Sequence, residues 1–90
     1  MPGPAEDERF TVKVRYFAAH REAAGVAEED VNLARGSTVA DLLNALQALH
    51  PGLAPLARDT VVSVNRGVGG PSVVLSEGDD VALFPPIAGG

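Results

Sequence analysis

The sequence contains no cysteine and no tryptophan. Without a thiol the chain can form no disulfide, bind no metal through sulfur and use no cysteine nucleophile, so any sulfur chemistry would need another group. It also lacks an apolar run of the roughly 18 residues that a membrane-spanning helix needs. Its N-terminus shows no basic segment followed by an apolar one, the pattern of a secretory signal. We therefore expect a soluble, cytoplasmic protein without a metal site.

Positive charge is scarce as well. Seven Lys and Arg residues stand against twelve Asp and Glu residues, which gives a formal net charge of −5. This balance argues against nucleic acid or an anionic membrane as a partner and is compatible with docking onto a basic protein surface. The length of 90 residues, of which 46% are hydrophobic, suits one small domain with its own core.

The C-terminal stretch is the most informative part of the sequence. Val81 and Leu83 alternate with less apolar residues, which predicts a strand with one face in the core. Pro85-Pro86 cannot donate ladder hydrogen bonds, so the strand should stop there and continue as an extended arm. Gly89-Gly90 carry no Cβ and can enter a channel too narrow for other residues. A carboxylate at the end of such an arm is suited to being handed to the active site of another protein.

A second strand is predicted over residues 10–17, where apolar and polar residues alternate with period two. The apolar face comprises Phe10, Val12, Val14 and Tyr16, and the opposite face comprises Thr11, Lys13, Arg15 and Phe17. The first set is the expected core face, which leaves Phe17 as an aromatic residue on the polar face.

One amphipathic helix is predicted after residue 37. Thr38 is the expected N-cap, and Asp41 suits the positive end of the helix dipole. The apolar positions at helical spacing are Val39, Leu42, Leu43, Leu46 and Leu49. Pro51-Gly52 should end this helix, and the residues that follow are expected to cover the core as irregular chain.

The remaining elements are shorter. We expect a short helix over residues 18–24, a weak strand over 28–33, a strong strand over 60–64, a glycine-rich bend over 65–70 and a short strand over 72–75. With the first and last strands as central neighbours, this order predicts an α+β fold, the ubiquitin-like β-grasp, with a mixed sheet of about five strands packed on one main helix. We expect a flexible leader over residues 1–8, the β-grasp domain over 9–86 and a flexible tail over 87–90.

No catalytic site of the chain's own is apparent. His20 and His50 have no third ligand at metal-binding spacing, so both are expected to be solvated. Residues 67–70 are rich in glycine, but no Lys-Ser/Thr pair and no helix follow, so a turn is expected rather than a phosphate loop. The acidic residues at 28–30 and 77–80 are expected on a solvated surface. We therefore expect no enzyme activity from this chain alone.

A contact surface is predicted on the open face of the sheet. If the first and last strands pair, Phe17 and Phe84 stand close together there, and Val68 in the glycine-rich bend can join them. Two interpretations are open, since the short helix around Arg21 can instead cover Phe17.

These pieces resemble the MoaD family, the small sulfur-carrier subunits of molybdopterin synthase. The residues that carry the resemblance are 14–22, 64–65, 77–81 and the phenylalanine-diproline-to-diglycine ending at 84–90. The carriers of thiamine synthesis (ThiS) and of cysteine synthesis share the fold and the diglycine. They are less similar to this chain around Tyr16 to Glu22 and at the diproline.

The resemblance implies a specific chemistry. An E1-like adenylating enzyme (MoeB/ThiF-like) would use ATP to activate the Gly90 carboxylate, and a sulfur donor would convert it to a thiocarboxylate. The tail would then enter a MoaE-like large subunit, where the sulfur is transferred to a pterin precursor. The carrier itself would bind no cofactor. The residues that would thread the large subunit are Gly89, Ala88 and Ile87, and those that would bind it are Phe17, Arg21, Val68, Phe84, Pro85 and Pro86.

Two other functions fit the same ending. A ubiquitin-like modifier would join its C-terminal glycine to lysines of other proteins. Lys13 is the only lysine here, so few positions are offered for linking several copies into a lysine-linked polymer. A carrier for cysteine or thiamine synthesis is the other alternative.

Overall fold

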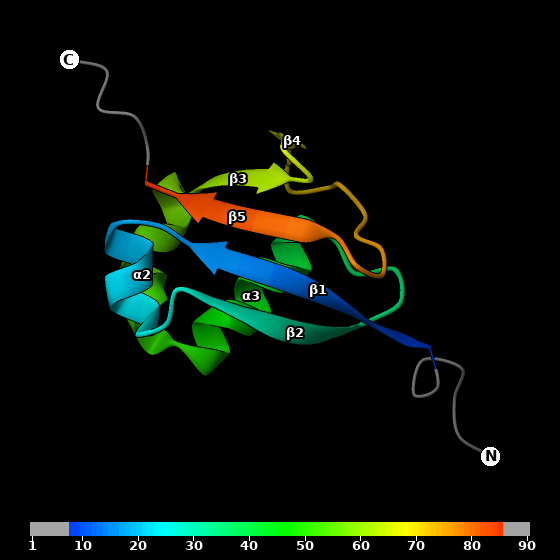
Figure 1. Cartoon of the computed structure of the whole chain (residues 1–90), viewed down its shortest axis with the longest axis horizontal. Coiled ribbons are helices and arrows are strands. Elements are labelled where there is room, and N and C mark those ends of the chain that lie inside the picture. Colours follow the sequence, from blue (N-terminus) through cyan, green and yellow to red (C-terminus); the bar gives the residue numbers. More distant parts are fainter. Residues whose placement is uncertain (1–7, 86–90) are drawn as a thin grey trace.

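The computed structural model describes residues 8–85, which form a five-stranded sheet with helices against one face (Figure 1). The elements are β1 (Arg9–Tyr16), α2 (Ala19–Ala24), β2 (Glu28–Ala34), α3 (Val39–Leu49), the 3₁₀-helix η1 (Pro51–Asp59), β3 (Val61–Val64), β4 (Gly67–Val68) and β5 (Asp80–Phe84). The main helix α3 crosses behind the sheet, and α2 lies at the end toward which β1 and β5 run (Figure 1). The other face of the sheet is open.

The strand order is β2-β1-β5-β3-β4. The central pair β1 and β5 is parallel, with Lys13 opposite Asp80 and Tyr16 opposite Leu83. The other neighbouring strands are antiparallel. The prediction that the first and last strands are central neighbours in a mixed sheet is therefore confirmed, and so is the β-grasp.

The core lies between the sheet and α3, where the alternation of β1 places every second side chain. The strand residues predicted to face inward are all buried on β1 and β5, with Val12, Val14 and Val81 fully so. The buried core residues are Phe10, Val12, Val14, Tyr16, Val31, Leu33, Val39, Leu42, Leu46, Leu53, Val62, Leu75, Val81 and Leu83.

Helix α3 begins where the sequence predicts. The Thr38 hydroxyl accepts from the Asp41 amide at 3.3 Å, and the Asp41 carboxylate accepts from the Thr38 amide at 2.9 Å, which is a complete capping box. Leu42 and Leu46 are buried, and Leu43 is half-buried. The prediction of a core position for Leu49 is wrong, because this last helical residue lies at the margin of the buried stripe and is 58% exposed.

The segment after α3 is more regular than expected. Instead of irregular chain it forms η1, which starts with Pro51 in the first turn, where a missing amide proton is tolerated. Leu53 is buried and Leu56 half-buried, and η1 contacts both α2 and α3. The expectation that these leucines cover the core is thus correct, although the backbone was predicted wrongly.

The predicted strand at residues 72–75 is absent. There the chain makes one isolated bridge, between Val74 and Thr38, and Leu75 is buried. The fifth strand is β4, inside the predicted bend. It forms because Asn65 and Arg66 both have positive φ, so the chain after β3 turns back on itself in a two-residue hairpin.

The predicted boundaries elsewhere agree to within one or two residues. The predicted flexible leader falls, apart from Glu8, outside the described residues, and the predicted tail falls wholly outside them. Within residues 8–85, no helix combines the length and apolar character that crossing a membrane requires.

Candidate functional site: an aromatic docking face at the end of β5

Two phenylalanines stack on the open face of the sheet. The Phe17 and Phe84 rings lie 4.7 Å apart between centroids, with 9° between their planes. The parallel register brings them together, because Phe17 donates its amide proton to the Leu83 carbonyl at 3.2 Å. Phe17 is 41% exposed, so α2 does not cover it. Of the two interpretations of Phe17, the structure therefore supports the exposed surface.

The backbone after Phe17 explains why the ring stays on this face. Ala18 has φ 51° and ψ −126°, a conformation with positive φ that non-glycine residues rarely adopt. This kink ends β1 and turns the chain into α2, which closes with Gly25 at φ 80° as its C-cap.

Two valines extend the apolar surface. Val61 of β3 lies directly opposite Phe84 and is 47% exposed. Sequence reasoning missed this residue, although its alternation with the buried Val62 carried the signal. Val68 is 96% exposed and lies opposite Ser63 on the edge strand β4. We call Phe17, Phe84, Val61 and Val68 the docking face.

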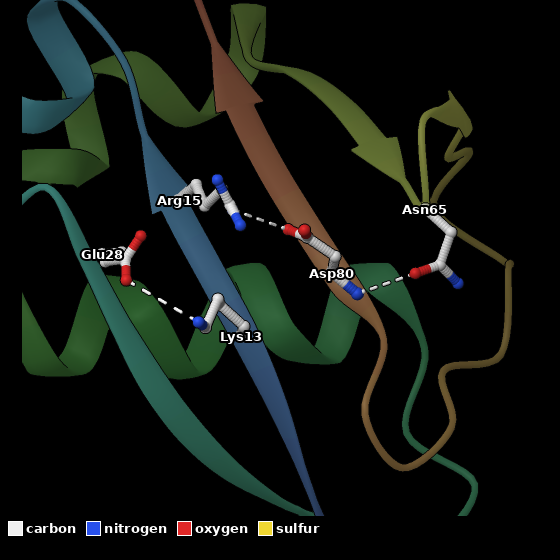
Figure 2. A network of polar contacts seen from close by, with 5 residues as sticks. All are labelled: Lys13, Arg15, Glu28, Asn65 and Asp80. Atoms are coloured by element: carbon white, nitrogen blue, oxygen red, sulfur yellow. Dashed lines mark hydrogen bonds and ion pairs between the residues drawn. The ribbon is translucent and has the colours of Figure 1, made fainter.

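A hollow of about 210 Å³ adjoins the stacked rings. Its lining consists of Arg15, Phe17, Ser63, Arg66, Asp80, Ala82 and Phe84. Among them, Arg15 donates from Nε to Asp80 Oδ1 at 3.1 Å, and the Asp80 amide donates to the Asn65 side-chain oxygen at 2.9 Å (Figure 2). Of these lining residues, Arg66 was not identified from the sequence.

A second hollow, of about 180 Å³, lies on the other side of Phe17. The exposed Arg21 of α2 lines it together with Arg15 and Glu28. Figure 2 shows Lys13 reaching from β1 to Glu28 of β2, at 3.7 Å between Nζ and Oε1. The open face thus has a charged half over β1 and β2 and a mainly apolar half over β5, β3 and β4.

The prediction of two solvated histidines is wrong. His20 is 1% exposed, and its Nε2 lies 2.8 Å from the Thr60 hydroxyl. That hydroxyl donates to the Leu56 carbonyl at 2.7 Å, so Nε2 must be the protonated nitrogen. The other nitrogen, Nδ1, is buried without a partner. Burial lowers the pKa of His20, which favours the neutral form.

The second histidine belongs to a polar cluster at the C-terminal end of α3. His50 is half-buried, and its Nε2 lies 2.5 Å from Oε2 of Glu29. The Tyr16 hydroxyl donates to the same oxygen at 2.6 Å. Burial first, and the Glu29 carboxylate second, raise the pKa of Tyr16, so this hydroxyl remains a donor. The cluster ties β1 and β2 to α3 and lies apart from the docking face.

Neither the glycine-rich segment nor the acidic turn forms a ligand site. Gly69 is buried, and a Cβ there would approach the Val64 side chain to 2.7 Å, so this glycine serves close packing. Asp79 accepts from the Ser76 amide at 2.7 Å and from the Asn65 side chain at 2.9 Å, which holds the turn before β5. In the part of the chain that the structure describes, no three metal-binding side chains cluster.

The predicted reactive end cannot be placed. Pro85 is half-buried directly after β5, whereas Pro86, Ile87, Ala88, Gly89 and Gly90 lie outside the described residues. The structure does place the docking face at the end of β5, the strand from which this segment continues (Figure 1).

The ThiS family model matches residues 14–90. The chain belongs to the ThiS family. Two curated relatives are similar over nearly their whole length. The molybdopterin synthase sulfur carrier subunit of Chlamydomonas reinhardtii is 40% identical over 81 residues, covering 88% of this chain and 98% of its own. The protein of the same name from Mycobacterium tuberculosis is 38% identical over 80 residues, covering 88% and 96%.

Solved structures of family proteins share the fold. The putative molybdopterin converting factor subunit 1 of Pyrococcus furiosus has a TM-score of 0.80 at 32% identity, covering 87% of this chain and 99% of its own. Small archaeal modifier protein 1 of Haloferax volcanii has a TM-score of 0.78 at 28% identity, with the same coverage. A chain from the complex of molybdopterin-converting factor subunits 1 and 2 of Helicobacter pylori has a TM-score of 0.61 at 23% identity, covering 90% and 100%. This last likeness supports the fold alone.

Proposed function

We propose that this ThiS family protein is the sulfur-carrier subunit of a molybdopterin synthase, with the Gly90 carboxylate as the group that carries sulfur. The observation that carries the proposal is the similarity to two molybdopterin synthase sulfur carrier subunits. They are 40% and 38% identical to this chain, and each match covers 88% of it. The phenylalanine-diproline-to-diglycine ending after β5 supports it further.

The chemistry follows from the nature of a carboxylate. It is a poor electrophile until it is activated, so an E1-like enzyme would transfer AMP from ATP to Gly90 and release pyrophosphate. Sulfur at the sulfide level (HS⁻) would then attack the acyl carbon, displace AMP and leave a thiocarboxylate. The chain has no cysteine, so the sulfur cannot be carried on a thiol of this protein. The carrier's part is to present the tail, while ATP and the catalytic groups belong to its partners.

The docking face gives the carrier a place to bind the large subunit. The stacked Phe17 and Phe84 lie at the end of β5, immediately before Pro85. Aromatic residues exposed together on one face are typical anchors of protein interfaces. A large subunit seated there would have its active site within reach of the tail. A chain of the same fold, from Helicobacter pylori, was solved in a complex of two subunits of a molybdopterin-converting factor, so this fold can pair with a second subunit. A cytoplasmic location stays a prediction.

Sulfur transfer to Gly90 can be tested directly. The purified chain is incubated with the E1-like enzyme, ATP and a sulfur donor, and its intact mass is measured. We expect a mass increase equal to one sulfur replacing one oxygen, and fragmentation that places it on Gly90. The same reaction without ATP is the control. An unchanged mass with the complete mixture would contradict the proposal.

A modifier function is the second candidate, favoured by the similarity to small archaeal modifier protein 1. Here the activated Gly90 would form an amide with a lysine of another protein. Lys13 lies half-exposed on the open face, paired with Glu28, and offers the chain's one lysine site for linkage between copies. The two candidates can be distinguished by incubating the tagged protein with cell extract and ATP. A modifier forms ATP-dependent conjugates with other proteins that survive treatment with a reductant, whereas a sulfur carrier forms none.

A further inference from the structure

Arg66 occupies an unusual position in the hairpin between β3 and β4. It has φ 72° and follows Asn65 at φ 50°, so both residues of the turn are left-handed. In such turns the second place strongly favours glycine, because a side chain there brings backbone strain. Strained positions are found frequently at binding and catalytic sites, where the side chain has a task that glycine cannot perform. The surroundings of Arg66 indicate what that task is.

Those surroundings carry an excess of positive charge. The hollow beside the stacked rings contains two guanidinium groups, Arg15 and Arg66, and one carboxylate, Asp80. Asp80 pairs with Arg15 at 3.1 Å, and no ion pair to Arg66 exists among residues 8–85. The whole chain has a net charge of −5, so this hollow opposes the overall charge of the molecule. Its local charge decides which groups of a partner fit there.

The other residues that line the hollow indicate which further side chains a partner can place there. Its lining includes the stacked rings of Phe17 and Phe84, together with Ala82 and the Arg15–Asp80 pair. An apolar side chain can pack against the rings, while a carboxylate beside it meets the exposed Arg66.

We propose that Arg66 binds an acidic side chain of the docking partner, on a segment whose apolar residues pack against Phe17 and Phe84. The proposal rests on the proposed function, in which the large subunit docks on this face. The net charge alone is compatible with a basic partner surface, but the local charge of this hollow favours an acidic one. At the hollow the complementary partner is acidic and apolar.

The turn itself supplies a sharp test, because Arg66→Gly removes the guanidinium and introduces the residue that the turn prefers. We expect the melting temperature to stay the same or rise. The dissociation constant of the complex with the large subunit should increase about tenfold at low salt, as for loss of a charge-assisted hydrogen bond. The difference should shrink as salt increases, because ions screen an exposed pair. Arg66→Glu should weaken binding more than Arg66→Gly does.

Two further variants separate the possible outcomes. Arg58→Gln removes a positive charge from the exposed part of η1 on the helical side of the sheet and should bind as the wild type does. If Arg66→Gly binds normally while Phe17→Ala binds weakly, the role of Arg66 is overturned and the docking face stands. If both bind normally, docking on this face is wrong and the inference falls with it. A wild-type dimer that Arg66→Gly converts to a monomer would assign the hollow to a second copy and overturn the proposal.

Discussion

The buried imidazole of His20 is hydrogen-bonded on one side only. Nε2 donates to Thr60, whereas Nδ1 has no acceptor or donor near it. Protonation would place a charged N–H at Nδ1 in surroundings without a partner, which is costly in a core. The residues that line the small apolar gap beside the ring carry no charge. Neutral His20 therefore fixes α2 against η1, and the charged form is disfavoured.

This arrangement predicts how stability changes with pH. Because burial lowers the pKa of His20 below its usual 6.5, the unfolded chain binds more protons than the folded chain as the pH falls through that value. Stability should thus be greater above about pH 6.5 and decrease progressively on acidification. Urea unfolding at several pH values between about 7.5 and 5.5 measures the free energy of unfolding as a function of pH.

The variant His20→Leu isolates this contribution. It keeps an apolar body in the core and cannot titrate, so its stability should fall less steeply with acid than that of the wild type. The rest of the chain is identical in the two proteins, so the difference between their pH dependences reports His20. Equal pH dependence in the two proteins would show that His20 does not couple folding to protonation.

Phe17 and Phe10 form a matched pair for separating binding from stability. Both are phenylalanines at the ends of β1, but Phe10 is buried and Phe17 is exposed. We expect Phe17→Ala to weaken binding to the large subunit by about 1–3 kcal/mol, as interface anchors do. Phe10→Ala should instead cost about 3–5 kcal/mol of folding stability. Denaturant unfolding and titration calorimetry of both variants test this, and a Phe17→Ala protein as unstable as Phe10→Ala would place Phe17 in the core.

The aromatic pair and the nearby Val68 were predictable from the sequence, whereas Val61 and Arg66 were not. Period-two alternation on β1 and β5 sends Phe17 and Phe84 to one face, whatever the register. The contribution of Arg66 depends on a left-handed turn that Asn65 favours and arginine does not. The burial of His20 depends on η1, a segment whose path was predicted to be irregular.

Helix α3 provides a test of the core among leucines of one element. Leu46 is fully buried, whereas Leu49, one turn later, faces solvent. Leu46→Ala should cost about 2–5 kcal/mol, because it leaves a cavity between the helix and the sheet. Leu49→Ala should change stability by less than about 0.5 kcal/mol. Urea unfolding of both variants measures the difference, and a small loss at Leu46 would mean that the helix packs by another face.

The elements with clear local signals could be predicted, whereas η1, β4 and the path of residues 70–75 could not. Helix α3 has a capping box and a clear apolar stripe, so its limits follow from local sequence. The segment after β4 is held instead by distant backbone partners. Leu75 donates to the Ser37 carbonyl at 2.9 Å, and Val39 donates to the Val73 carbonyl at 2.9 Å. Such pairing depends on where α3 starts, which no pattern within residues 70–75 reveals.

The topology of the molecule follows from two strong strands and one strong helix. Because β1 and β5 carry the most regular alternation, they occupy the centre of the sheet, and the single long helix must cover one face. This leaves the other face open for a partner. Docking and sulfur transfer would then be separate tasks, one carried by the sheet face and the other by the chain beyond Pro85.

That separation predicts that changes at the C-terminus leave folding intact. Among residues 8–85, the buried core extends from Phe10 to Leu83, so a change at Gly90 alters none of the residues that form it. Deleting Gly90 or appending one alanine should therefore leave the urea midpoint and its slope unchanged. Thiocarboxylation should nevertheless be lost, because the carboxylate is displaced from the activating enzyme's reacting atoms, and small misplacements cost about 100-fold in rate.

Intact-mass measurement of both variants beside the wild type checks the chemistry, and urea unfolding checks the fold. If the alanine-extended chain takes up sulfur as fast as the wild type, the position of the Gly90 carboxylate does not matter and the tail is not the working end. If it unfolds more easily, the tail contributes to the fold and the two tasks are not separate. Sulfur uptake by the wild type alone, with equal unfolding in all three proteins, is the result that a carrier with an independent sulfur-bearing end requires.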